Sequence, residues 1–288
     1  MKLPYIDLHT HTCLSDGAVT PEELTAEAER CGVGILAITD HNRPADLTGL
    51  RLAHPRMRLI QGAEISCMYT DPEGAEHELH VVALGFDPNH PAMQEVFRQN
   101  QPDRRPYIEA ILGKLAKFGI DVGTYDSLCA AQNRSSHVGR MHIAKAMVER
   151  GYVKTVDEAF DIYLGVHGQK LCYTPNPLRY VTLEQAVAAI LAAGGVAVLA
   201  HLYYYCLSDK GNHDLLAYFS RLTNGRGGME TEYSIYDRQT RDGLADLAKQ
   251  YGLMASCASD YHGLKSDETM DHRFPAEICR DLMACLNS

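Results

Sequence analysis

The sequence has 288 residues, 45% of them hydrophobic and 22% charged, so it is long enough to bury a large core and has the composition of an ordinary globular protein. Its formal charge of −10 argues against tight binding of duplex nucleic acid, which needs a basic surface. No apolar stretch is long enough to span a membrane and the first residues lack a signal sequence, so we expect a cytoplasmic protein.

The first candidate site lies in the segment Tyr5–Gly17, which is predicted to be a short apolar strand that runs into a polar loop. Side chains two positions apart along a strand point to the same face, so His9 and His11 project together. Asp16 follows on the loop. Neutral imidazoles are the commonest protein metal ligands, so the segment is a candidate metal site. Two solvated histidines at a strand end are the alternative.

A helix is predicted over Glu22–Cys31, because Thr20 is a good N-cap and a proline and two acids follow it. Near-continuous apolar runs then predict strands that are covered on both faces. Each of the next three strands carries a ligand-type side chain: Val33–Thr39 leads to His41, Arg58–Ala63 leads to Glu64, and His77–Phe86 contains His80.

The strand pattern stops between about residue 100 and residue 173. This stretch has helical segments and no apolar strand of the earlier type, so we expect a helical cap at residues 100–173, inserted into a main domain of residues 1–99 and 174–288. The expected helices of the cap are Tyr107–Phe118, Val138–Arg150 and Val156–Tyr163.

Strands and helices alternate again after the cap. Apolar strands are predicted at Val196–Ala200, which ends at His201, and at Gly228–Tyr233, where Glu230 and Glu232 are expected to face the same side. The other expected elements are a strand over Leu253–Ala258, which leads to Asp260 and His262, and helices over Leu183–Ala193, Asp214–Leu222, Asp237–Tyr251 and Ala276–Leu286.

Strands that alternate with helices imply parallel strands with right-handed crossovers, and about seven such units suit an α/β barrel related to the TIM barrel. The carboxyl ends of barrel strands meet at one rim. Imidazoles and carboxylates without a thiolate cluster favour Mn²⁺, Fe²⁺ or Zn²⁺, and the number of ligands suggests two or three ions. Such a site would hydrolyse a phosphate ester or an amide-like bond. The predicted rim residues are His9, His11, His41, Glu64, His201, Glu230, Asp260 and His262.

Several short motifs, taken in order, resemble the PHP (polymerase and histidinol phosphatase) family. They are H-x-H-x4-D from His9 to Asp16, T-D-H ending at His41, G-A-E at Glu64, A-H at His201 and S-D-x-H from Asp260 to His262. The resemblance implies a distorted (β/α)7 barrel, up to three metal ions and a bridging water as the nucleophile. It also implies three ligand sets: His9, His11, Glu64 and Asp260; Glu64, His80 and His201; and Asp16, His41 and His262.

One departure from the family follows His201. The family often has proline after this histidine, whereas here Leu202 is followed by three tyrosines at 203–205. The tyrosines could flank a nucleobase, or they could have the structural role of covering the base of the cap.

The insertion resembles that of a family branch with nucleotide phosphatases, through the G-R-x-H-I-A sequence at Gly139–Ala144. Arg140 could then form a bidentate contact with a phosphate, and His142 could hydrogen-bond to it or donate a proton to the leaving oxygen. A solvated helix face is the alternative for both. Lys170 and Arg134 are further candidates for phosphate contacts. Two acids beside the candidate ligands, Asp40 and Glu230, are expected to orient them.

The sequence therefore predicts a metal-dependent phosphomonoesterase that acts on a small nucleotide, either AMP or a nucleoside 3′,5′-bisphosphate, with the cap closing over the nucleoside. Expected partners are the nucleotide and phosphate, and not duplex nucleic acid or a membrane. Histidinol phosphatase and 5′-3′ exonuclease activity on short RNA are the alternative reactions. A metal-storing or regulatory module is the non-enzymatic alternative. The native metal and the oligomeric state stay open.

Overall fold

The computed structural model describes residues 5–100, 105–131, 138–166, 168–173, 180–264 and 268–287. Two compact units make up the chain: a barrel unit, Met1–Asn100 with Tyr180–Ser288, and a helical unit, Gln101–Arg179. None of the helices in the described ranges is both long and apolar enough to cross a membrane. The domain boundaries drawn from the sequence, at residues 100 and 173, stay a proposal.

The barrel unit is built on one seven-stranded sheet in which the strands follow one another in chain order. Its strands are β1 (Tyr5–Asp7), β2 (Val33–Ile38), β3 (Arg58–Thr70), β4 (Glu76–Leu84), β5 (Val196–Leu199), β6 (Gly227–Tyr233) and β7 (Met254–Ala258). The first and last strands meet, because the Leu8 N–H donates to the Cys257 carbonyl at 3.0 Å and Thr10 pairs in parallel with Tyr261. The predicted fold class, a seven-stranded α/β barrel, is confirmed.

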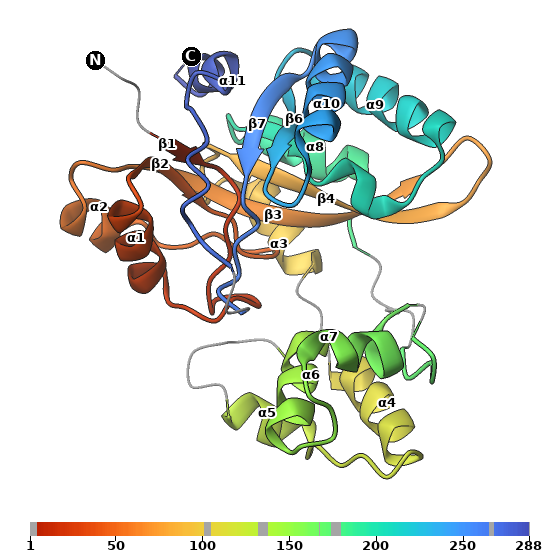
Figure 1. Cartoon of the computed structure of the whole chain (residues 1–288). Helices are drawn as coiled ribbons and strands as arrows, with labels where there is room; N and C mark the ends of the chain where they lie inside the picture. Colours follow the sequence, from red (N-terminus) through yellow and green to blue (C-terminus); the bar gives the residue numbers. More distant parts are fainter. Residues whose placement is uncertain are drawn as a thin grey trace. The chain divides into compact units, whose positions relative to one another are not determined.

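Strand β4 runs antiparallel to both of its neighbours, whereas the other strand pairs are parallel. The prediction that all strands are parallel is therefore wrong for β4. Only residues 71–75 separate β3 from β4, and a parallel connection needs a dozen residues or more. The two strands form a long hairpin that extends past the other strands (Figure 1). Glu64 and His80 consequently lie within strands and not at strand ends.

Helices pack around this sheet (Figure 1), and α1, α8, α9 and α10 each begin after a side chain that caps the helix. At Thr20 the side chain accepts from the Glu23 N–H at 3.2 Å, and the Glu23 carboxylate accepts from the Thr20 N–H at 2.8 Å. Helices α2 and α3 were not predicted, because their sequences are short or polar. The helices of the unit are α1 (Pro21–Arg30), α2 (Thr48–Ala53), α3 (Pro91–Asn100), α8 (Leu183–Ala192), α9 (Asp209–Thr223), α10 (Arg238–Tyr251) and α11 (Arg280–Cys285), with a 3₁₀ helix at Leu202–Tyr205.

The helical unit has a separate apolar core, which includes the buried side chains of Ile111, Leu128 and Met147. The expected helix over Val156–Tyr163 is wrong in its second half, where the backbone widens into a π-helical turn, Phe160–Leu164. The α-helices of this unit are α4 (Arg105–Ala116), α5 (Tyr125–Ala130), which was not predicted, α6 (Arg140–Glu149) and α7 (Val156–Ala159).

Candidate metal centre

Glu64 is the centre of a cluster of ionisable side chains in the barrel unit. It lies on β3 with only 1% of its surface exposed. Each of five histidines places a ring nitrogen close to one of its two carboxylate oxygens. The nitrogen–oxygen distances are 2.9 Å for His80, 3.0 Å for His41, 3.2 Å for His201, 3.3 Å for His11 and 3.4 Å for His9. One buried carboxylate thus joins five histidines from four separate segments of the barrel.

Two aspartates complete the cluster. Asp260, which follows β7, places its Oδ1 atom 3.2 Å from His11 Nε2. Asp16, on the loop after β1, lies 3.4 Å from His262 Nε2 and 3.5 Å from His41 Nε2. The structure therefore brings together all nine residues that the sequence proposed as metal ligands, although their role as ligands stays a prediction.

The ligand-type atoms form three groups in which all atoms lie within 4.8 Å of one another. Their membership differs from the sets implied by the family resemblance, because His11 and His41 each belong to two groups. The groups are His11, Asp16, His41 and His262; His9, His11 and Asp260; and His41, Glu64 and His80.

Several buried nitrogen atoms of the cluster lack a hydrogen bond. Two of them, in His41 and His80, lie within 3.0 Å of Glu64 without hydrogen-bond geometry. Buried polar atoms are normally hydrogen-bonded, so this concentration of unpaired nitrogens calls for another partner. Neutral imidazoles together with carboxylates suit divalent transition metals, so the residues fit such ions. Within the cluster the unpaired atoms are the Nδ1 atoms of His11, His41, His80 and His201.

The cluster also shifts the pKa values of its members. Burial would raise the pKa of Glu64, but the charges of His41, His80 and His9 outweigh it and hold that pKa well below its usual range. Burial would lower the pKa of His80, but Glu64 raises it to about 9. Glu64 and His80 thus favour each other's charged form, and an ion bound by His80 would have to displace the proton of its imidazole.

Glu230 and Asp40, the two acids expected to orient ligands, act on different parts of the centre. Glu230, on β6, places Oε1 2.6 Å from His9 Nδ1, and its Oε2 accepts from the His201 N–H at 2.6 Å. Its hydrogen bond leaves the Nε2 atom of His9 to face the cluster. Asp40 instead accepts from the Thr12 N–H at 2.8 Å and from the Ser15 hydroxyl at 2.6 Å, and so holds the loop that leads to Asp16.

The expectation that Glu230 and Glu232 face the same side is wrong. The register of β6 against β7 shifts between these two residues, so the simple alternation of side chains is interrupted. Glu232 pairs instead with the Arg241 guanidinium of α10, at 3.0 Å.

Two tyrosines support the centre: Tyr233, which the sequence did not single out, and Tyr205, one of the three tyrosines noted after His201. Tyr233 donates to Asp260 Oδ2 at 2.6 Å, and burial together with Asp260 raises the pKa of this phenol, so it keeps its proton. Tyr205 accepts from the His80 N–H at 3.0 Å and donates to the Ala200 carbonyl at 2.9 Å. Tyr233 had no local sequence signal, because its partner lies 27 positions away.

Backbone strain is concentrated at the same place. Asp260 has a φ of +55° and His201 a φ of +26°, values that non-glycine residues rarely adopt. Such conformations cost about 1–3 kcal/mol each and persist where the surrounding structure holds them. The strain turns both side chains into the cluster directly after their strands.

The proposed substrate contacts lie in the helical unit. Arg140 begins α6, donates to the Leu164 carbonyl at 3.2 Å and stacks over the Tyr173 ring at 5.1 Å. His142 is buried, so the alternative that it lies on a solvated helix face is wrong. Its Nδ1 atom accepts a hydrogen bond from the Gly139 N–H at 2.8 Å.

The two weaker candidates differ in what can be said of them. Lys170 donates to the Tyr163 hydroxyl at 3.2 Å and lies 5.2 Å from the centre of the Phe118 ring. Arg134 lies outside the described residues. Contacts of these residues with a substrate, like those of Arg140 and His142, stay predictions.

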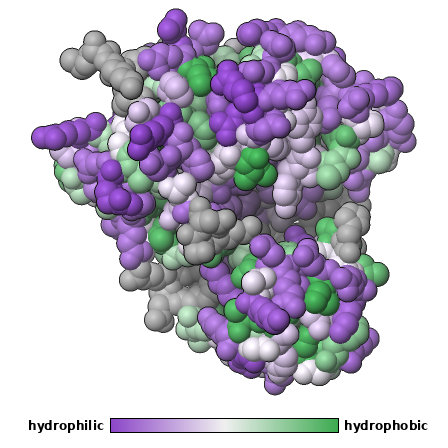
Figure 2. All heavy atoms as spheres, in the orientation of Figure 1, coloured by the Kyte–Doolittle hydropathy of each residue, from purple (hydrophilic) through white to green (hydrophobic). Residues whose placement is uncertain are grey.

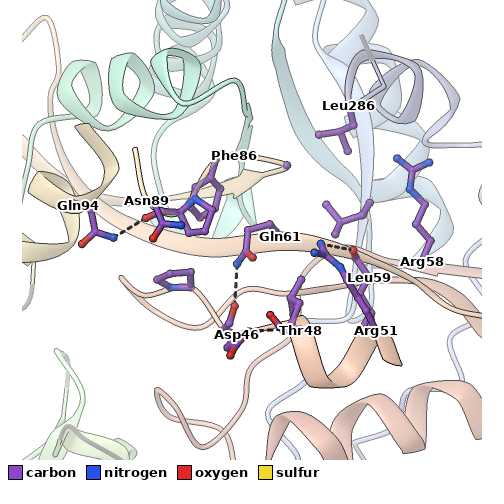
Figure 3. A pocket seen from close by; sticks show the side chains of 16 residues that line it. Asp46, Thr48, Arg51, Arg58, Leu59, Gln61, Phe86, Asn89, Gln94 and Leu286 are labelled. Atoms are coloured by element: carbon purple, nitrogen blue, oxygen red, sulfur yellow. Dashed lines mark hydrogen bonds between the residues drawn. The ribbon is translucent and has the colours of Figure 1, made fainter. Parts of the chain in front are cut away.

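A cavity of about 730 Å³ lies elsewhere in the barrel unit, between α2, the start of β3 and the end of β4 (Figure 3). Arg51, Arg58 and Gln61 line it together with apolar side chains such as Phe86. The Gln61 side chain donates to the Ala45 carbonyl at 3.2 Å. None of the proposed ligands lines this cavity. The cavity is therefore separate from the candidate metal centre.

Comparison with known proteins gives concordant results. Residues 7–134 match the PHP domain family. The chain is 36% identical over 260 residues to the 5′-3′ exoribonuclease Rnm of Salmonella typhimurium, covering 89% of this chain and 84% of that protein. It is 30% identical over 264 residues to a 3′,5′-nucleoside bisphosphate phosphatase of Chromobacterium violaceum, covering 89% of this chain and 87% of that protein.

A solved structure is similar over almost the whole chain. It is that of an amidohydrolase from Chromobacterium violaceum with bound sulfate and no metal, with a TM-score of 0.81 and 28% sequence identity. The alignment covers 98% of this chain and 96% of that one.

Proposed function

Since this chain belongs to the PHP domain family and is a metal-dependent phosphoesterase, we propose that it removes the 3′-phosphate from a nucleoside 3′,5′-bisphosphate. The observation that carries the proposal is the cluster of nine ligand-type side chains around the buried carboxylate of Glu64. The relative from Chromobacterium violaceum supports the choice of substrate. AMP is then the product formed from the adenosine compound.

The nine clustered residues would hold two or three divalent ions, of manganese, iron or zinc. Bound there, such ions would neutralise phosphate charge and lower the pKa of a water until it is a nucleophile near neutral pH. Glu230 orients His9 and Tyr233 orients Asp260 through the hydrogen bonds described above. These contacts hold the ligands in place before the substrate arrives, which spares the reaction the cost of arranging them.

Two residues of the helical unit are proposed to contact the substrate. The guanidinium of Arg140 has the planar fork that matches a phosphate. Because Nδ1 of His142 accepts from the Gly139 N–H, the neutral ring carries its proton on Nε2. That nitrogen can therefore donate to a phosphate oxygen or to the leaving oxygen.

Short RNA with a 5′-phosphate is the second candidate substrate. Its support is the 36% identity to the exoribonuclease of Salmonella typhimurium. The two candidates are chemically related, because a nucleoside 3′,5′-bisphosphate is the shortest unit that has the 5′-phosphate and the 3′-phosphate ester of such an RNA. Hydrolysis on the 3′ side of the first nucleotide would serve both.

Phosphate release in the presence of Mn²⁺ tests the proposal, with adenosine 3′,5′-bisphosphate, AMP, histidinol phosphate and a short 5′-phosphorylated RNA compared at equal concentration. We expect the highest kcat/KM for the bisphosphate, with AMP as the accumulating product. Release of 5′-mononucleotides from RNA at a higher kcat/KM would favour the second candidate. A preference for histidinol phosphate or AMP would overturn the proposal. A protein that binds Mn²⁺ and hydrolyses nothing would favour the non-enzymatic module.

A further inference from the structure

Exposed hydrophobic side chains of the barrel unit gather beside the candidate metal centre. Its described residues include four large hydrophobic side chains that are exposed, and three of them, Tyr203, Tyr204 and Ile235, lie in the segments after β5 and β6. The fourth, Leu52, is on α2. The visible face of this unit is mostly hydrophilic, with scattered hydrophobic residues (Figure 2). A local concentration of this kind indicates a binding surface, whereas single exposed hydrophobic residues need no explanation.

The tyrosines lie directly beside the candidate metal centre. Tyr203 and Tyr204 lie on the 3₁₀ helix that follows His201, and the Tyr204 ring stands edge-on to the His201 ring with 5.4 Å between their centres. Tyr204 nevertheless leaves 74% of its surface exposed. The Tyr203 ring contacts Tyr236 at 5.9 Å, which joins the segments after β5 and β6.

The chain holds this short helix firmly. Tyr205 is anchored by its hydrogen bonds to the backbone of Ala200 and His80, and Cys206 ends the helix with a φ of +52°. Tyr203 is supported by Tyr236, which in turn contacts Tyr233 with 5.0 Å between the ring centres. A rigid aromatic side chain offers contact area at a small cost in conformational entropy.

We infer that Tyr204, supported by Tyr203, is a stacking platform for the nucleobase of the substrate, an inference that rests on the proposed function. A phosphate held at the cluster places the rest of the substrate against the next exposed surface, and that surface is aromatic. Every nucleobase has a flat π-face that stacks on tyrosine, whereas a bare sugar phosphate or an aliphatic phosphate gains nothing from it. The platform therefore selects nucleotides among small phosphate esters.

The test compares two substrates, adenosine 3′,5′-bisphosphate and ribose 3,5-bisphosphate, which lacks the base. The variants are Tyr204→Ala, Tyr204→Phe, Tyr203→Ala and the matched surface control Leu52→Ala. We expect Tyr204→Ala to raise KM for the adenosine compound about tenfold, because the variant loses the ring on which the base stacks. Its kcat should stay within about twofold, because no ligand is altered. Tyr204→Phe should retain the wild-type KM, and Tyr203→Ala should show a smaller rise.

For the substrate without a base, all four variants should match the wild type. The inference is overturned if Tyr204→Ala leaves the KM for the adenosine compound unchanged, or raises KM equally for both substrates. Failure of the proposed function looks different, because the wild type itself would then release no phosphate from the bisphosphate, and both ideas would be overturned. Melting temperatures of the variants, expected to be unchanged at these exposed positions, separate a loss of stacking from a loss of folding.

Discussion

The two units of this chain have opposite charge. Residues 101–179, the helical unit, contain 11 basic and 8 acidic side chains and carry a formal charge of +3. The remainder contains 16 basic and 29 acidic side chains and carries −13. The acidic unit suits cations and the basic unit suits anions. The total of −10 conceals this division, so net charge alone is a poor guide to the ligands of a two-unit chain.

Their interiors differ as well. In the parts of the helical unit that the structure describes, the buried polar or charged side chains are limited to His142, and the core is apolar. The barrel unit buries His9, His11, His201 and Glu64 side by side. Burying ionisable groups costs free energy unless they are paired or bind metal. The barrel therefore has ionisable side chains at buried positions that apolar residues could occupy, which indicates a functional site there. The apolar core of the helical unit shows no such cluster in its described parts.

Glu64→Gln should have the largest effect. The change removes the charge that five imidazoles share, so phosphate release from adenosine 3′,5′-bisphosphate should fall by at least about 10³-fold. Glu109→Gln, on an exposed position of α4, makes the same chemical change in the helical unit and should leave the rate unchanged. Equal losses in the two variants would contradict the assignment of the chemistry to the barrel.

Metal removal should affect the two units unequally. Mn²⁺ at a hundred times its Kd should raise the free energy of unfolding by about 2.7 kcal/mol, because the ion binds only the folded cluster. Hydrogen exchange measured with and without chelator should show the change at residues 9–16 and around residue 260, and none in α6. A similar change in both units would refute a metal centre that is confined to the barrel.

Glu230→Gln should weaken metal binding by about 10–100-fold, the usual cost of losing a group that orients a ligand. The kcat value should largely recover at saturating Mn²⁺, because no proposed ligand is removed. Glu232→Gln is the matched control two positions along the same strand, where the carboxylate pairs with Arg241. Metal affinity is measured by calorimetric titration, and identical affinities for the two variants would show that Glu230 does not orient His9.

Arg140→Ala tests the basic unit and should have the smallest effect of the four. We expect KM for the bisphosphate to rise about tenfold, since a hydrogen bond to a charged group contributes about 1.5–3 kcal/mol. The rise should shrink at high salt as charges are screened. Arg150→Ala, at the other end of α6, removes the same charge and should leave KM unchanged. A lower melting temperature with unchanged KM would assign Arg140 a structural role alone, through its contact with Leu164.

Much of the candidate centre could be predicted, because its ligand-type residues are recognised from neighbours a few positions away in the sequence. His9 and His11 are two positions apart directly after β1, and His41, His201 and Asp260 each follow an apolar run within a few residues. Helix starts such as Thr20 are equally local, because a cap involves residues within one turn. For such features the residue types and their spacing suffice, whatever the rest of the chain does.

Other features depend on residues that are far apart in the chain, and only the tertiary structure decided them. The bonds of Glu230 to His9 and of Tyr233 to Asp260 span 221 and 27 positions. The shifted register that turns Glu232 away from Glu230 arises from pairing with β7. The direction of β4, the positive φ at Asp260 and the two ligand groups that share His11 follow in the same way. Sequence periodicity describes one element at a time, whereas these contacts depend on how elements pack against one another.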